Sequence, residues 1–178
     1  MGAEDLVLRD ATADDVAVIA EIYNESIAVA NATMDAEPKT AEDIRRQMAA
    51  FTKRELYVML ESSEKTLGWG LIKLYSPRAG YSRCAETSVY LHQSRVRRGY
   101  GSFIKRALIA RCKTFGYHHL IARVWADNVA SIEYNRRFGY EVVGVQREIG
   151  YIDGHWQDIA VLQLVLDDVD PEVADRFE

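Results

Sequence analysis

The stretch RVRRGYGSF, residues 95–103, sets arginines and then two glycines before an expected helix. The N-terminus of a helix points unpaired N–H groups outward and carries about half a positive charge, so it favours phosphate groups. Gly99 and Gly101 would let a ligand approach the backbone closely, and the arginines would add positive charge. The stretch therefore predicts a site for a phosphate-bearing ligand, with a nucleic-acid contact or an ordinary solvated turn as the alternatives.

The rest of the chain narrows this choice. The formal net charge is −5 and the pI is about 5.4, whereas nucleic-acid-binding proteins favour a basic surface. The sequence contains no GxxxxGK[ST] phosphate loop, and a dinucleotide fingerprint fails because Ile104 stands where its third glycine or alanine belongs. These observations favour a small anionic ligand that binds through neither of these two motifs.

Length and composition indicate one globular domain. The chain has 178 residues, of which 48% are hydrophobic and 28% charged, as expected for a soluble protein with a substantial core. We expect a single domain over residues 1–166 and a loosely ordered acidic tail over 167–178. No apolar run approaches the roughly 20 residues of a membrane helix, and the N-terminus lacks a signal-peptide pattern, which predicts a cytoplasmic protein. Cys84 and Cys112 are expected to be small buried thiols.

Hydrophobic periodicity predicts alternating strands and helices. Strands are expected over residues 6–11, 55–62, 66–76, 84–91 and 119–126, and two more on either side of the turn YIDGH. Helices are expected over 12–30, 40–51, 102–115 and 128–138, with N-caps at Thr12, Thr40 and Asn128 and stops at Gly116 and Gly139. Strands separated by helices in this way indicate a single α/β or α+β sheet domain.

The helix expected over residues 102–115 has one apolar face. Phe103 and Ile104 belong to that face, whereas Lys105 is expected to lie away from it together with the other basic residues of the helix.

Two longer segments carry a resemblance to a known family. VYLHQSRVRRGYGSFIKRALI resembles the acetyl-CoA-binding motif of the Gcn5-related N-acetyltransferase (GNAT) superfamily, whose core is [QR]xxGxG/A after a strand. ARVWADNVASIEYNRRFGYEVVG is similar to the later NxxSxxxxxxxGF segment of that superfamily. Within it, IYNESI, PRAGYSRCAETSVYLH and GHWQD resemble the phosphinothricin and methionine sulfoximine N-acetyltransferases, and the likeness extends over residues 6–166. The resemblance implies the GNAT fold, a mixed and mostly antiparallel sheet of about six to seven strands flanked by helices.

The resemblance also implies that acetyl-CoA is the co-substrate. Its pantetheine arm would lie between the strands over residues 86–92 and 119–126, paired with backbone groups like an added strand. The residues expected to bind it are Val89, Leu91, Arg95, Arg97, Arg98, Gly99, Gly101, Ser102, Asn128, Ser131 and Asn135. Val96 departs from the family pattern, because the core motif usually begins with Gln or Arg, and the neighbouring arginines are expected to substitute for that side chain.

Acetyl transfer from a thioester to an amine requires a neutral nitrogen, so an enzyme must remove a proton and stabilise an oxyanion. By resemblance Glu86 is the expected base, and the alternative is a glutamate on a solvated strand face. The family often has Tyr or His as the acid where this chain has Asn135, which cannot donate a proton usefully. Tyr134 is adjacent, and for it a catalytic role and core packing stay equally open; a thiolate can also leave without an acid.

Substrate residues are implied in the same way. Arg78 would bind the carboxylate of an amino-acid-like substrate, with a surface arginine as the alternative, and Tyr81, Asn24 and Thr33 would lie nearby. Trp156 would pack against a partner subunit, the substrate pocket or the core. His92 and His155 stand alone and His118 and His119 would face opposite ways, so no metal site is expected.

These observations predict an enzyme that moves the acetyl group of acetyl-CoA to the α-amine of a small amino-acid-like substrate by direct attack. The alternatives are a GNAT enzyme that acts on a polyamine, an aminoglycoside or a protein N-terminus, and a non-catalytic acyl-CoA sensor. A homodimer is expected by resemblance, with no nucleic-acid or membrane partner.

Overall fold

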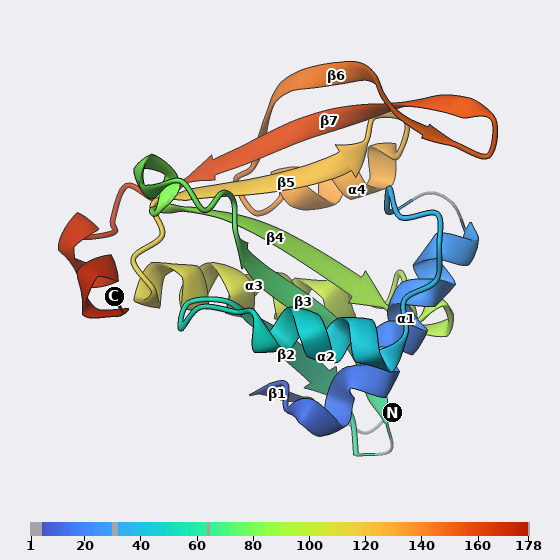
Figure 1. Cartoon of the computed structure of the whole chain (residues 1–178), viewed down its shortest axis with the longest axis horizontal. Coiled ribbons are helices and arrows are strands. Elements are labelled where there is room, and N and C mark those ends of the chain that lie inside the picture. Colours follow the sequence, from blue (N-terminus) through green and yellow to red (C-terminus); the bar gives the residue numbers. More distant parts are fainter. Residues whose placement is uncertain (1–4, 30–31, 64, 178) are drawn as a thin grey trace.

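The protein is described from a computed structural model that covers residues 5–29, 32–63 and 65–177. Seven strands form one sheet in the order β1-β2-β3-β4-β5-β7-β6 (Figure 1). Every neighbouring pair is antiparallel except β4 and β5, so the expected mixed and mostly antiparallel sheet is confirmed. The strands are β1 (Val7–Asp10), β2 (Leu56–Glu61), β3 (Thr66–Leu74), β4 (Cys84–Leu91), β5 (His119–Trp125), β6 (Glu141–Ile152) and β7 (His155–Val165).

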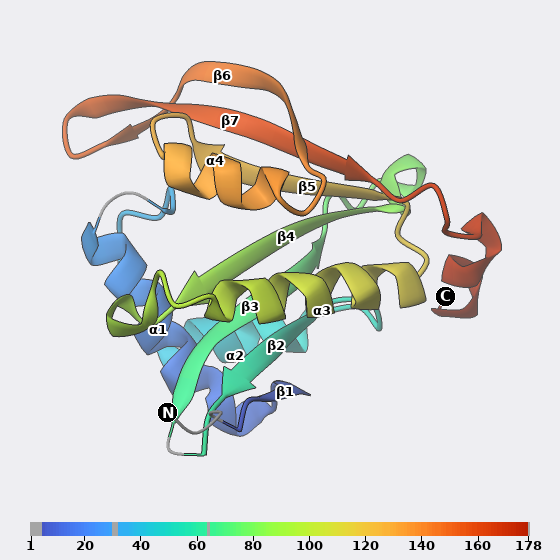
Figure 2. The same ribbon diagram turned by 180° about the vertical axis from the view of Figure 1, so that it is seen from behind.

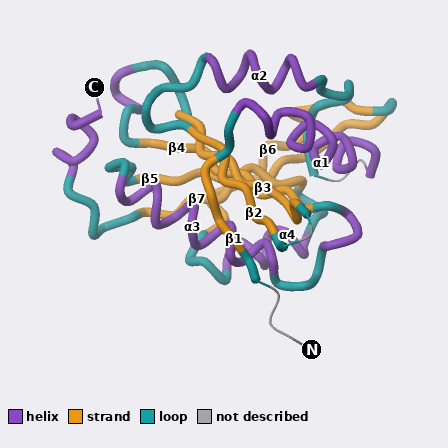
Figure 3. Tube along the Cα trace, turned by 90° about the horizontal axis from the view of Figure 1, so that it is seen from below, coloured by secondary structure: helices purple, strands orange, loops and turns teal. Residues whose placement is uncertain are grey.

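Four α-helices cover the sheet from both sides. The bounds are α1 (Val16–Val29), α2 (Ala41–Ala49), α3 (Tyr100–Thr114) and α4 (Val129–Arg136). Helices α1 and α2 lie on one face, while α3 and α4 lie on the other (Figures 2 and 3). Two apolar clusters follow from this layering: one joins α1 and α2 to β2 and β3, and the larger one lies beneath α3.

The helix starts follow the capping residues. Thr12 forms a capping box with Asp15 before a short 3₁₀ turn (Ala13–Asp15) that leads into α1, and Thr40 forms one with Asp43 at α2. The side chain of Asn128 accepts the Ser131 N–H at the start of α4. These three predicted caps are confirmed, because each depends only on groups a few residues apart.

Helix α3 begins at Tyr100, two residues earlier than predicted. Gly99 is its N-cap, and its φ of +86° is a left-handed conformation that glycine adopts without steric cost. The helix also lies unusually close to β3: a Cβ atom added to Gly70 would lie 2.5 Å from the Ile104 side chain. This close approach fixes the start of α3 against the centre of the sheet.

Two side chains of α3 contradict the predicted apolar face. Phe103 is 44% exposed, whereas Lys105 is only 2% exposed and belongs to the buried side. Lys105, Leu108 and Cys112 follow i, i+3, i+7 spacing, which places them on one face of the helix. The prediction failed because it followed the charge of Lys105 rather than its spacing.

The parallel pairing of β4 with β5 is short. It joins Cys84 to His119, Ala85 to Leu120 and Glu86 to Ile121, and beyond these pairs the strands separate (Figure 1). The Cys84 carbonyl accepts the Tyr75 N–H and the His92 N–H donates to the Leu67 carbonyl. Backbone groups alternate in direction along a strand, so the even-numbered residues of β4 face β3. The backbone groups of odd-numbered Val89 and Leu91 therefore face the opening.

Arg9 of β1 joins three elements at the far edge of the sheet. Its Nε and Nη2 donate to Glu61 of β2 at 3.0 and 2.6 Å, and its Nη1 and Nη2 donate to Asp15 at 2.8 and 2.7 Å. A further Nη1 bond reaches the Asp10 carbonyl, so all five guanidinium donors are engaged. Arg9 holds the pKa of Asp15 down at about 2.

The C-terminal segment differs from its prediction as a loosely ordered tail. A 3₁₀ helix (Pro171–Phe177) lies beside the end of α3 (Figure 1), with Val169 and Ala174 buried. Phe177 packs edge-on against Phe115 at a centroid distance of 5.3 Å, and Lys113 binds Asp168 at 2.6 Å. Acidic composition suggested solvation, but the apolar residues of the segment have a core to pack on. No helix in the described part of the chain is long and apolar enough to cross a membrane.

Candidate active site

A cavity of about 640 Å³, the larger cavity, lies between the α1–α2 connection and the sheet. Aromatic side chains and charged groups of both signs line it. Its lining includes Tyr23, Thr33, Asp35, Lys73, Glu86, Ser88, Tyr90, Arg123 and Trp125. The cavity can accept a small molecule that carries charge and has an apolar part.

A smaller cavity of about 80 Å³ lies where β4 and β5 separate. Its lining includes Thr87, Val89, Lys105, Val124, Asn128, Ser131, Tyr134 and Asn135. Ala32, Ser88, Tyr90, Arg123 and Trp125 line both cavities. A molecule held in the opening between the strands therefore meets a molecule in the larger cavity at this shared wall.

Glu86 lies beside the shared wall and is held by Arg123. The Nε and Nη2 of Arg123 donate to its two carboxylate oxygens at 2.9 and 2.6 Å. Arg123 is two residues beyond the last β4–β5 pair, and Lys73 faces Glu86 in the β3–β4 register. The contact with Glu86 raises the pKa of Arg123, so the guanidinium stays charged. Two cations thus flank the predicted base.

The segment after α1 closes one side of the larger cavity. The Thr33 hydroxyl lies 2.6 Å from the Tyr23 hydroxyl, which also donates to Asp35 at 2.6 Å. The Trp125 indole donates to the Thr33 carbonyl at 3.2 Å, and the Tyr90 hydroxyl donates to the Ala32 carbonyl at 3.3 Å. Burial raises the pKa of Tyr90 to about 12, so it remains a hydrogen-bond donor. Thr33 therefore lies in the wall of the larger cavity.

Helix α4 brings polar groups to the smaller cavity. The Asn128 side chain caps the helix, and the Asn135 amide donates to the Ser131 carbonyl at 2.9 Å. Asn135 is 4% exposed, and its Oδ1 has no hydrogen-bond partner among the described residues. A buried acceptor without a partner is costly, so a donor from a ligand would be favoured there.

Tyr134 both packs and lines the smaller cavity. Its hydroxyl donates to the Gly101 carbonyl at 2.7 Å, which ties α4 to the first turn of α3. Burial raises its pKa, so the hydroxyl keeps its proton at neutral pH. Lys105 lines the same cavity, with its Nζ 4.7 Å from the ring centroid of Tyr140, and burial lowers its pKa to about 8.

The predicted phosphate turn lies at the end of β4. Arg97 has a φ of +62° and Gly99 one of +86°, so the chain turns sharply before α3. Arg98 is exposed, while the Nε of Arg95 is buried without a hydrogen-bond partner in the described part of the chain. Leu91 and Ser102 flank this turn on the strand and helix sides.

Three residues predicted to bind substrate do not line the larger cavity in the described part of the chain. Both ends of the Asn24 amide bond the Lys39 backbone at 2.8 Å, so this side chain holds the connection between α1 and α2. Arg78 is exposed at a short 3₁₀ turn (Ala79–Tyr81), and Tyr81 is 45% exposed against Tyr75. None of the three belongs to the cavity lining in the part of the chain that is described.

Comparison with known proteins agrees with this geometry. The model of the acetyltransferase (GNAT) domain family matches residues 8–161. The chain belongs to the GNAT acetyltransferase family. It is accordingly an acetyl-CoA-dependent N-acetyltransferase with the GNAT fold, as the sequence motifs indicated.

Individual relatives resemble the acetyltransferase over most of its length. It is 30% identical to an L-methionine sulfoximine/L-methionine sulfone acetyltransferase of Pseudomonas aeruginosa, over 90% of this chain and 94% of that protein. It is also 30% identical to a phosphinothricin N-acetyltransferase of Alcaligenes faecalis, over 88% and 79% respectively. The crystal structure of a phosphinothricin acetyltransferase of Sinorhizobium meliloti with acetyl-CoA is similar, with a TM-score of 0.86 and 28% identity over 92% and 90%.

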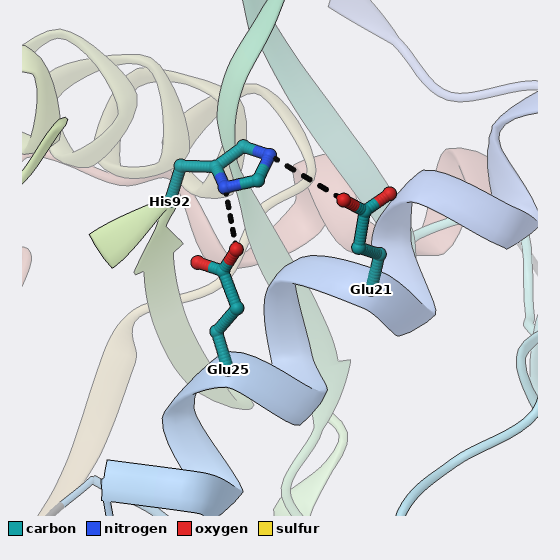
Figure 4. Close-up of side chains that lie close together, drawn as sticks. All are labelled: Glu21, Glu25 and His92. Carbon is teal, nitrogen blue, oxygen red and sulfur yellow. Dashed lines mark ion pairs between the residues drawn. The ribbon is translucent and has the colours of Figure 1, made fainter. Parts of the chain in front are cut away.

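His92 of the acetyltransferase does not stand alone, which corrects the prediction. Its Nδ1 lies 2.7 Å from Glu25 and its Nε2 lies 4.0 Å from Glu21, both on α1 (Figure 4). The second carboxylate oxygen of Glu25 accepts the Gln93 N–H at 2.7 Å. Both oxygens of Glu25 are therefore occupied, and the cluster ties α1 to the segment that leads into the phosphate turn.

Sequence reasoning missed Arg123, Lys73 and Lys105 as residues of the acetyltransferase site. Arg123 had a usable signal, because it is the one charged residue in the strand segment LIARVW. Leu120, Ala122 and Val124 of that strand are buried, so alternation places Arg123 on the opposite face. Lys73 could be assigned only after its register with Glu86 was known.

Proposed function

We propose that this enzyme transfers the acetyl group of acetyl-CoA to the α-amine of a small amino-acid-like substrate, with Glu86 as the base. The observation that carries the proposal is the Glu86–Arg123 pair beside the wall shared by the two cavities. An ammonium entering the larger cavity would meet the Glu86 carboxylate before it reached the opening between the strands. The names of the relatives, which act on methionine sulfoximine and phosphinothricin, support the same substrate class.

Glu86 retains the capacity to accept a proton. A carboxylate offers about four lone-pair positions, and Arg123 occupies two of them. A substrate ammonium on a remaining position would give up its proton to Glu86, which leaves the nitrogen with the lone pair that attack requires. Lys73 and Arg123 would then balance the charge of the carboxylate between turnovers.

The residues around the smaller cavity suit acetyl-CoA, which supplies an activated acetyl thioester. The backbone groups of Val89 and Leu91 would pair with its amide groups, and the unsatisfied Oδ1 of Asn135 would accept a donor. Near the α3 entrance, Arg95, Arg97, Arg98, Gly99, Gly101 and Ser102 would hold the phosphates, while Asn128 and Ser131 complete the wall. Val96, 39% exposed, leaves the neighbouring arginines to supply the positive charge.

The state of the cysteines supports direct attack without an acyl-enzyme. Cys84 and Cys112 are buried, and burial raises their thiol pKa values to about 11 and about 12. Only a thiolate is an effective nucleophile, so neither side chain is suited to carry the acetyl group. For Tyr134 as general acid the support is its position in the smaller cavity, and its bond to Gly101 is the competing structural role.

The test is release of free thiol from acetyl-CoA with a panel of acceptors. The panel contains phosphinothricin, L-methionine sulfoximine, a polyamine, an aminoglycoside and a peptide with a free N-terminus. The proposal expects the highest kcat/KM with the two amino-acid-like compounds. Preference for another amine, or tight coenzyme binding without any turnover, would overturn it.

We also propose a homodimer formed through the β6–β7 hairpin. Large apolar side chains are exposed there: Val143, Val145, Ile149, Tyr151 and Trp156, the last at 62%. Burial of such a group against a second copy is more favourable than its exposure to water. Sedimentation should give twice the monomer mass for the wild type and a lower mass for Trp156→Glu; a monomeric wild type would refute the dimer.

The enzyme is further proposed to be cytoplasmic, without a nucleic-acid or membrane partner. Two buried free thiols are typical of a reducing compartment, and the net charge of −5 disfavours general binding to nucleic acid. Fractionation of the native host and gel-shift titration with duplex DNA would test these two statements.

A further inference from the structure

The Arg123 guanidinium has N–H donors that its bonds to Glu86 do not use. It carries five N–H groups, and the two bonds to Glu86 use one on Nε and one on Nη2. Three N–H donors remain, and two of them, one on Nη1 and one on Nη2, form the second edge of the guanidinium. No acceptor for this edge occurs among the described residues, and the side chain is 55% exposed.

Arg9 shows which kind of group binds to the Nη1–Nη2 edge in the same protein. Its Nε and Nη2 hold Glu61, just as the Nε and Nη2 of Arg123 hold Glu86. Its Nη1 and Nη2 hold a second carboxylate, Asp15. Around Arg9 both edges bind acceptors of the chain, whereas the second edge of Arg123 has no carboxylate partner among the described residues.

The position of Arg123 determines where a second carboxylate would come from. Arg123 lines both cavities and therefore borders the space that an acceptor must enter. An arginine fork binds a carboxylate through two parallel N–H···O bonds, with defined orientation as well as charge. A carboxylate from the larger cavity can take this edge without displacing Glu86.

We propose that Arg123 anchors the substrate's carboxylate through its Nη1–Nη2 edge and thereby makes the enzyme selective for α-amino acids. The inference rests on the proposed function and names the residue that sets its substrate class. In an α-amino acid one carbon separates the carboxylate from the ammonium. A substrate held by Arg123 therefore places its ammonium beside Glu86, which the same guanidinium holds.

Two other cations compete for this role. Arg78 was predicted from the sequence, but it is exposed and lies outside the cavity lining. Lys73 lines the cavity, yet its ammonium is a point charge without the planar fork. Among these three, only Arg123 has side-chain hydrogen bonds to Glu86 in the described structure, so it alone couples the substrate carboxylate to the base.

The experiment compares wild type, Arg123→Gln, Arg123→Lys, Arg78→Gln and Lys73→Gln, with Arg45→Gln as a matched control. Arg45 pairs with Glu42 on the surface of α2, and neither residue lines either cavity. Acceptors are L-methionine sulfoximine and its carboxamide, which keeps the amine but lacks the negative charge. Thiol release gives kcat and KM, and calorimetry gives the affinities for acetyl-CoA and for each acceptor.

Loss of a charged bidentate contact should raise the KM of the amino acid about 10- to 100-fold in Arg123→Gln. Arg123→Lys should recover only part of the loss. The calorimetric affinity for the carboxamide should change less than about 3-fold in either variant, because this acceptor offers no carboxylate to the fork. Thermal unfolding of the Arg123 variants should stay close to that of the wild type, because the arginine of the pair is 55% exposed, which shows that the variants are folded.

Equal affinity of wild type and Arg123→Gln for the amino acid overturns the anchor, as does a larger loss in Arg78→Gln or Lys73→Gln. Failure of the proposed function gives a different result: the wild type binds L-methionine sulfoximine in an Arg123-dependent manner but releases no thiol. Binding and turnover thus separate the two claims.

Discussion

Two arginines of this protein hold carboxylates with the same edge of the guanidinium group, yet only one is enclosed. Arg9 engages five acceptors and joins β1, β2 and the turn before α1. Arg123 binds only Glu86 among the described residues and borders two cavities. Arg9, with residues of the chain on both edges of its guanidinium, stabilises the fold. Arg123, with one edge unoccupied by the described residues, can bind a ligand.

The sharpest way to test this contrast is to neutralise one carboxylate in each cluster. Glu86→Gln should lower kcat about 100- to 10,000-fold, the usual range for a general base, with unchanged acetyl-CoA affinity. Glu61→Gln, in the Arg9 cluster, should leave kcat unchanged and lower the free energy of unfolding. Steady-state kinetics and denaturant unfolding measure both; an unchanged kcat in Glu86→Gln would remove it as the base.

Removal of the enclosed arginine should cost stability rather than activity. Arg9→Met leaves Asp15, which is 6% exposed, and Glu61 without their cation. The side chain of Arg9 is 35% exposed and that of Asp15 is 9% exposed, so the cluster is partly buried. Urea unfolding should therefore show a loss of about 1–3 kcal/mol. Arg45→Met provides the matched control, because its pair is exposed and should contribute less than about 1 kcal/mol.

Acid should weaken the Arg9 cluster in a defined pH range. Arg9 lowers the pKa of Asp15 from 3.8 to about 2 in the folded protein. The resulting stability, about 2 kcal/mol, is fully present above pH 4 and is lost as the pH falls through 2. Urea unfolding of wild type and Asp15→Asn between pH 5 and pH 2 should converge in that interval; a constant difference would contradict the assignment.

The smallest effect on stability should come from removal of Arg123. Arg123→Met removes a pair whose arginine is 55% exposed, so the free energy of unfolding should change by less than about 1 kcal/mol. Thermal unfolding beside Arg9→Met gives the comparison. A loss of stability equal to that of Arg9→Met would show that the two arginines contribute equally to the stability of the fold.

Local signals predicted the elements well. The capping boxes at Thr12 and Thr40 and the cap at Asn128 depend on groups within three residues, and each forms as predicted. Gly99 carried the signal for the start of α3, but the predicted start was two residues late. Features that depend on residues close together in the sequence could thus be predicted from the sequence.

The site was harder to predict because it depends on register. Glu86 and Thr33, which line the larger cavity, were predicted through resemblance, whereas Arg123 joins Glu86 only because β5 pairs with β4 at Ile121. His92 meets Glu25 across a separation that no periodicity encodes. Lys105 was misplaced because a charge was weighed above helical spacing.

The short ladder between β4 and β5 has a consequence for exchange of backbone hydrogen with solvent. The amides of Val89 and Leu91 face the opening and should exchange rapidly in the free enzyme, whereas those of Ser88 and Tyr90 face β3 and should exchange slowly. Acetyl-CoA in the opening should slow the first pair and leave the second unchanged. The coenzyme would then complete the sheet as an eighth strand, so its concentration would set part of the protein's own resistance to unfolding.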